Sequence, residues 1–183
     1  MSKLQAKTVI VTGGAGGIGG ATCRRFAAEG AKVAVFDMNL EAAEQVAADI
    51  RAAGGQAAAF KCDITDRAAV DAARGGSSGE AVYSACKGGL VALSKTLARE
   101  HARHNITVNV VCPGPTDTAL LAGVAEGARD PAKLIEAFRS AIPLGRLGQP
   151  DDLANAIVFF GSDDASFITG QVISVSGGLT MHG

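Results

Sequence analysis

The sequence predicts an α/β fold built on a doubly wound parallel sheet with helices on both faces, in three layers. Two observations carry this prediction. Short runs of β-branched and apolar residues alternate with segments of helical periodicity, as in βαβ units. A cluster of glycines also stands where the first apolar run meets the first helical segment.

The first third of the chain shows the alternation most clearly. Strands are expected at 8–12, 32–36 (ending at Asp37) and, more weakly, 56–61. Helices are expected at 18–28 and 40–53, and each is followed by glycine, the residue favoured just after a helix.

The same rhythm returns after residue 79. One long helix is expected over 80–104 and a buried strand over 106–111, broken by Pro113 and Pro115. Residues 116–145 are expected to form a long polar connection, interrupted by proline and glycine, that contains one helix at 131–140. A helix at 151–161 and a last strand at 171–175 complete the pattern.

Composition excludes several classes of protein. Seventeen basic and eighteen acidic residues give a net charge of −1, so no electrostatic footprint for nucleic acid or an anionic membrane is present. The four cysteines form no C-x-x-C pair, which favours reduced thiols over a disulfide framework or a metal site. The N-terminus lacks a signal-peptide pattern and no apolar run is long enough to span a membrane, so we expect a cytoplasmic protein.

The glycine cluster predicts a dinucleotide site. Between the first strand and first helix, backbone without side chains can approach a pyrophosphate, and the helix N-terminus faces its negative charge. A plain turn is the alternative. The position between strand and helix favours the first reading and a single Rossmann-type NAD(P)-binding domain over 1–183, with cofactor contacts from Gly13, Gly16, Gly17, Ile18 and Gly19.

Asp37 indicates which dinucleotide is bound. At the end of the second strand its carboxylate can accept hydrogen bonds from the ribose hydroxyls of NAD and would repel the 2'-phosphate of NADP. The neighbouring Met38 and Asn39 supply no cation for that phosphate, although Asp37 can also be only a turn former. Asp63, followed by Ile64, is placed either to meet the adenine amine or to begin the next helix.

Tyr83 and Lys87 are the candidate catalytic residues. They lie four residues apart on a predicted helix and so share a face, where the lysine ammonium would favour the phenolate and lower the tyrosine pKa. That arrangement suits proton transfer to or from a carbinol oxygen. The small residues around the pair leave room for a ligand or a neighbouring helix.

These segments resemble the short-chain dehydrogenase/reductase family. The resemblance rests on 12–19, 63–65, 83–87 and the Cys-Pro-Gly-Pro-Thr-Asp-Thr run at 112–118. It implies an NAD(P)-dependent alcohol/ketone oxidoreductase in which Tyr83 is the general acid/base and Lys87 binds the nicotinamide ribose. It also implies that the nicotinamide side is lined by Pro113, Gly114, Thr116 and Thr118.

Within that family, segments 77–83 and 113–121 are similar to the 2-hydroxycyclohexanecarboxyl-CoA dehydrogenases. This likeness implies oxidation of a 3-hydroxyacyl-CoA-type secondary alcohol to the 3-keto thioester, with hydride passing to NAD. The family resemblance further implies a homodimer or homotetramer, with Leu90, Leu93 and Leu97 packed against a second copy; packing on the chain's own sheet is the alternative.

The centre of the chain departs from the family pattern. Only nineteen residues separate Asp63 from Tyr83. The family's Asn-Asn-Ala-Gly segment, a helical Asn and the serine about thirteen residues before the tyrosine have no counterpart, and Ser77 and Ser78 lie too close to Tyr83 for that role. Two strand-helix units, on the order of 60 residues, are lacking. We hypothesise that the natural protein carries a further segment between Ala68 and Gly75, because the gap would otherwise expose unpaired strands.

Other features have simpler interpretations. His101 and His104 suit a helix C-terminus better than a metal site, and Cys86 reads as a packing residue rather than a nucleophile. An apolar group after Thr118 is either a substrate lid or surface-helix packing: Leu120, Leu121, Val124 and Ile135. Two functions stay open, an NAD-dependent dehydrogenase and a truncated, catalytically inactive dinucleotide-binding or interaction protein.

Overall fold

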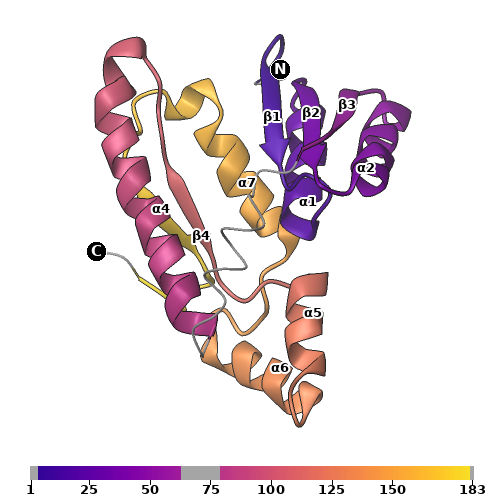
Figure 1. The fold of residues 1–183 in the computed structure, drawn as a ribbon, viewed down its shortest axis with the longest axis vertical. Helices are drawn as coiled ribbons and strands as arrows, with labels where there is room; N and C mark the ends of the chain where they lie inside the picture. Colours follow the sequence, from indigo (N-terminus) through magenta and orange to yellow (C-terminus); the bar gives the residue numbers. More distant parts are fainter. Residues whose placement is uncertain (1–3, 63–78, 182–183) are drawn as a thin grey trace.

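A computed structural model describes residues 4–62 and 79–181 (Figure 1). The N-terminal part is a three-stranded parallel sheet with two helices, and the predicted strands are confirmed to the residue. Its elements are β1 (Thr8–Thr12), α1 (Gly17–Ala28), β2 (Lys32–Asp37), α2 (Leu40–Ala52) and β3 (Gln56–Lys61).

Strand β2 lies between β1 and β3, and Thr12 is paired with Phe36 while Asp37 is paired with Lys61. The glycine turn and Asp37 therefore emerge together at the carboxyl edge of the sheet, where ligands bind in doubly wound folds. Beneath the sheet α1 and α2 bury their apolar faces against Val33 and Val35.

The described C-terminal part contains a second, two-stranded parallel sheet, four α-helices and two 3₁₀ turns. Its elements are α4 (Gly79–His101), a 3₁₀ turn (Ala102–His104), β4 (Val110–Pro113), α5 (Ala119–Glu126), α6 (Pro131–Ala141), α7 (Pro150–Phe160), a second 3₁₀ turn (Asp163–Ala165) and β5 (Val172–Val175). No helix in the described ranges has the length and apolarity needed to cross a bilayer.

Two predictions for this part were wrong in detail. The strand expected at 106–111 begins only at Val110, because the Val108 amide donates to the Thr169 side chain instead of to a strand carbonyl. It also runs through Pro113, which pairs with Val175. Helix α5 was missed in the supposed loop; the Thr118 side chain caps its first turn by accepting from the Leu121 amide.

Helix α7 joins the two parts. In Figure 1 it lies between the β1–β3 sheet and α4, and it packs along α1 as well as against β4 and β5. Val158 of α7 belongs to the same buried cluster as Phe26 of α1, and the Phe26 ring lies directly over Gly161. An exposed ion pair from Lys7 to Asp163, 2.5 Å long, ties the same parts at the surface.

In the described residues the two sheets share no ladder. A cavity of about 490 Å³ separates the free edge of β1 from Thr107 and Asn109, with α1 and α7 as its other walls. Ile10, in the middle of β1, is 63% exposed beside it. This agrees with the hypothesis that strands are lacking here; the proposed break between Ala68 and Gly75 lies outside the described residues.

We predict that Phe26→Ala lowers the free energy of unfolding by about 3–5 kcal/mol, because it removes the buried ring between α1 and α7 and leaves a cavity there. Urea denaturation followed by far-UV circular dichroism measures this. Phe167→Ala is the matched control, since that ring is fully exposed, and its unfolding midpoint should stay unchanged. Equal midpoints for both variants would contradict the role given to α7.

Candidate functional site

The glycine turn between β1 and α1 needs its glycines for conformation and for close approach. Gly13 has φ +67°, a left-handed conformation that costs other residues free energy. A Cβ on Gly14 would lie 2.7 Å from the Val35 side chain, and one on Gly19 would overlap the Gly13 carbonyl. The turn therefore lies flat against the start of α1.

The start of α1 is suited to an anion. Its N-cap is Gly16, so no side chain satisfies the first helical amides, and its first turn holds no acidic residue. Gly16 and Gly17 are exposed. Gly17, Ile18 and Gly19 form the first turn of α1. Their backbone amides have no hydrogen-bond acceptor within the helix, because no helical carbonyl lies four residues before them. These residues fit the pyrophosphate of a dinucleotide, which would accept hydrogen bonds there and favour the positive end of the helix dipole.

Asp37 lies directly beside the glycine turn. One carboxylate oxygen accepts a hydrogen bond from the Ala15 amide at 3.0 Å, and the other accepts from the Asn39 amide at 3.0 Å. Met38 is half exposed at the same edge. Each carboxylate oxygen retains capacity for another donor, so the group can still accept from a ribose hydroxyl. The register also places Lys61 opposite Asp37, a cation that the sequence reasoning did not weigh.

The 113–118 segment meets the glycine turn from the other side. A Cβ on Gly17 would lie 3.1 Å from the Thr118 methyl group, so these two motifs, distant in sequence, come together. Thr116 is buried and donates to the Gly114 carbonyl at 2.8 Å. Gly114 packs so closely on the Ser176 backbone that a Cβ would lie 2.7 Å away. Pro113, Gly114 and Thr116 thus hold the segment in place, and Thr118 lies nearest the turn.

The predicted catalytic pair lies on α4. Tyr83 and Lys87 are one turn apart there, as expected, and Lys87 is exposed. The orientation of the Tyr83 side chain is outside the described structure. Asp63 and Ile64 also lie outside the described residues. Their assigned roles therefore stay predictions.

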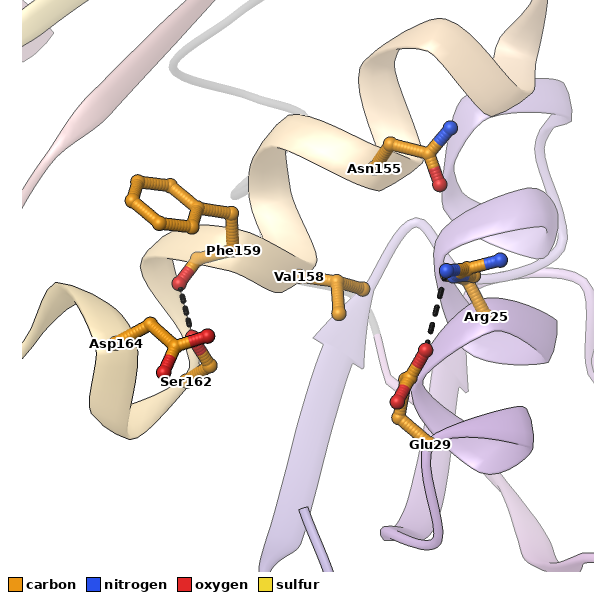
Figure 2. Close-up of a pocket in the computed structure, with 7 residues that line it drawn as sticks. All are labelled: Arg25, Glu29, Asn155, Val158, Phe159, Ser162 and Asp164. Atoms are coloured by element: carbon orange, nitrogen blue, oxygen red, sulfur yellow. Dashed lines mark hydrogen bonds and ion pairs between the residues drawn. The ribbon is translucent and has the colours of Figure 1, made fainter. Parts of the chain in front are cut away.

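The Cys23 thiol is a buried packing group. Burial raises the pKa of the Cys23 thiol to about 11, which leaves it protonated and unreactive at neutral pH. No group of three or more potential metal ligands occurs in the described ranges. The cavity in Figure 2, about 310 Å³, lies between the far end of α1 and the end of α7, where Arg25 is paired with Glu29. It is at the opposite end of α1 from the glycine turn and is not part of this site.

Two family models match the chain and together span nearly all of it. The model described as short chain dehydrogenase matches residues 7–76. The model described as enoyl-(acyl carrier protein) reductase matches residues 71–180.

Individual relatives agree with these matches. The uncharacterized oxidoreductase YxbG of Bacillus subtilis is 31% identical, over 100% of this chain and 94% of the relative. The acetoacetyl-CoA reductase of Rhizobium meliloti is 46% identical over 56% of this chain and 41% of its own length. Among solved structures, a hydroxysteroid dehydrogenase from Escherichia coli has a TM-score of 0.85 at 28% identity and covers 98% of each chain.

The alignment with the Bacillus subtilis oxidoreductase also measures the gap. It extends over 258 positions, whereas this chain has 183 residues, a difference of 75 positions. About 75 positions of the alignment therefore have no residue in this chain. The difference is close to the two strand-helix units whose absence the sequence indicated.

We predict that Gly19→Ala abolishes tight binding of NADH and destabilises the fold, because the added methyl group overlaps the Gly13 carbonyl. NADH fluorescence titration and thermal unfolding measure the two effects. Gly88→Ala is the control: Gly88 is exposed in α4 with open space around its Cα. Because alanine is the better helix former, that variant should gain about 0.5–1 kcal/mol. Unaltered binding by Gly19→Ala would refute the assignment of this turn.

Proposed function

Because this chain belongs to the short-chain dehydrogenase/reductase family, we propose that it is an NAD-dependent oxidoreductase interconverting a secondary alcohol and a ketone. We further propose that residues 1–183 form one cofactor-binding domain and that the protein is a cytoplasmic homodimer or homotetramer. The family is established by the comparisons; the cofactor, substrate and assembly are the proposed parts.

The observation that carries the proposal is the meeting of three motifs at one edge of the first sheet. Asp37 bonds to the glycine turn through the Ala15 amide, and Thr118 contacts Gly17 from the other side. The glycine turn lies between the expected adenosine-ribose and nicotinamide ends of a dinucleotide. If the glycine segment were only a tight turn, there would be no reason for Asp37 and Thr118 both to lie against it.

The chemistry is assigned to α4. NAD held at this site would supply the hydride acceptor for oxidation of the alcohol. Tyr83 holds or takes up the proton of the substrate oxygen, and Lys87, one helical turn later, favours the phenolate by its charge. Lys87 also serves to bind the nicotinamide ribose. Thr118, beside the glycine turn, limits where the nicotinamide end can lie.

A 3-hydroxyacyl-CoA-type thioester is the proposed substrate class. The sequence likeness to 2-hydroxycyclohexanecarboxyl-CoA dehydrogenases suggested it, and the name of the Rhizobium meliloti relative, acetoacetyl-CoA reductase, describes the same functional group. The relatives reported above include no 2-hydroxycyclohexanecarboxyl-CoA dehydrogenase, so that narrower likeness stays a prediction.

A second function is favoured by one structural observation. Among the described residues β1 has no strand partner on the edge beside the 490 Å³ cavity, which supports an incomplete substrate half of the sheet. A protein of this length would then bind a dinucleotide without turnover. Intact mass separates the two cases: a mass several kDa above 18.4 kDa means that the missing units are present, and 18.4 kDa means that they are not.

We predict NADH formation from a panel of secondary alcohols and 3-hydroxyacyl-CoA thioesters, followed at 340 nm. Tyr83→Phe should reduce turnover at least a hundredfold, because general acid/base catalysis contributes about 10²–10⁴-fold. The dissociation constant for NADH should hardly change in that variant. Cofactor binding with no turnover by the parent protein would instead support the second function.

We predict that the protein binds NADH more tightly than NADPH and that Asp37→Asn reduces this preference by about tenfold, a free-energy difference of about 1.4 kcal/mol. The substitution removes the negative charge that repels a 2'-phosphate and leaves the cation of Lys61 opposite. Asp130→Asn, which makes the same charge change at the N-cap of α6, is the control. A preference for NADPH in the parent would refute the assignment of NAD.

A further inference from the structure

Arg146 and Asp152 form a two-point ion pair at the start of α7. The Arg146 Nη1 and Nη2 atoms donate to the two Asp152 carboxylate oxygens at 2.6 and 3.0 Å. Asp152 Oδ2 also accepts from the Gln149 amide at 2.7 Å, closing the capping box of α7. The hydrogen bonds from Arg146 and then from Gln149 lower the pKa of Asp152 to about 2, so the carboxylate is ionised at neutral pH.

Residues 145–149 form the turn that leads from Arg146 into α7. This turn is hydrogen-bonded to the 113–118 segment in the manner of two parallel strands. The Gly148 amide donates to the Pro115 carbonyl at 2.9 Å, and the Asp117 amide donates to the Gly148 carbonyl at 2.8 Å. The two stretches form an isolated parallel bridge between Thr116 and Gly148. The turn therefore fixes the backbone on both sides of Thr116.

The fixed backbone leads directly to the cofactor site. Thr118 follows Asp117, caps α5, and lies against Gly17 of the glycine turn. A continuous set of contacts thus runs from the ion pair through Gly148 to Thr118. We propose that Arg146 is a positioning residue for the nicotinamide end of the cofactor: it holds the 145–149 turn, and the turn holds Thr118 in place. This inference rests on the proposed function, since it assigns that end to Thr118.

The pair is poorly explained as a stabilising device alone. The Arg146 side chain is 54% exposed, and exposed ion pairs add little to the free energy of unfolding. A planar guanidinium bonded at two points instead fixes direction, which a single lysine bond does not. The capping box already satisfies the Gln149 amide without Arg146.

The test compares Arg146→Gln and Arg146→Lys with Arg139→Gln. Arg139 makes a similarly exposed pair with Glu136 on α6 and does not contact the 145–149 turn through it. Dissociation constants are measured for NADH and for ADP-ribose, which lacks the nicotinamide ring. Amide hydrogen exchange at Gly148 and Asp117 is measured without any cofactor.

We expect Arg146→Gln to weaken NADH binding on the order of threefold to tenfold while ADP-ribose binding changes less than about twofold, since only the nicotinamide end is displaced. The Lys variant should lie between Gln and parent. Exchange at Gly148 and Asp117 should accelerate in Arg146→Gln and stay unchanged in Arg139→Gln.

Two results would overturn the inference: unchanged exchange at Gly148 and Asp117 in Arg146→Gln, or equal weakening of NADH and ADP-ribose. The second result would indicate general destabilisation. If the parent protein binds neither compound, the proposed function fails; accelerated exchange would then still support the link from Arg146 through the turn at Gly148 to the backbone of Pro115 and Asp117.

Discussion

The packing of α7 on α1 is the contact on which the described structure depends most. The two sheets exchange no ladder hydrogen bonds in the described ranges, so their relative position follows from helix contacts around Phe26, Val158 and Gly161. The N-termini of these two helices lie at parts of the proposed cofactor site. The glycine turn lies at the N-terminus of α1, and the Arg146–Asp152 pair lies at the N-terminus of α7. Moving one helix along the other would separate Thr118 from Gly17.

Among the described residues β1 is paired on one edge only, by β2. A strand as apolar as β1 is normally buried on both faces and paired on both edges, whereas Ile10 here is largely exposed. Adjacent strands of a sheet lie about 4.8 Å apart, so each further strand would widen the sheet by about that distance. The cavity beside β1 lies at the edge where such strands would pair. The alignment difference of 75 positions is of the right size for two strand-helix units.

Local patterns predicted much of the fold, and long-range pairing explains what they missed. The first three strands and Asp37 were found because each apolar run is bounded by glycine or a polar residue. Helix α5 was missed although Thr118 before an apolar run is a cap signal, because nearby prolines and glycines suggested a loop. The late start of β4 depends on Thr169, and the position of Lys61 opposite Asp37 depends on register. Neither can be read from nearby residues.

The two halves of the site differ in what they require. The proposed adenosine half is formed by β1, α1 and β2, which are consecutive in sequence and packed on one core, with β1 and β2 hydrogen-bonded to each other. In the proposed mechanism the catalytic half requires Tyr83 on α4 to meet a substrate oxygen beside Thr118. Among the described residues, that part is joined to the first sheet through α7 and the Lys7–Asp163 ion pair. Under the proposed function, cofactor binding should therefore tolerate a lack of central strands better than hydride transfer, which depends on the alignment that α7 maintains between the two parts. For that reason the dehydrogenase and the inactive binding protein should differ in turnover more than in affinity for the dinucleotide.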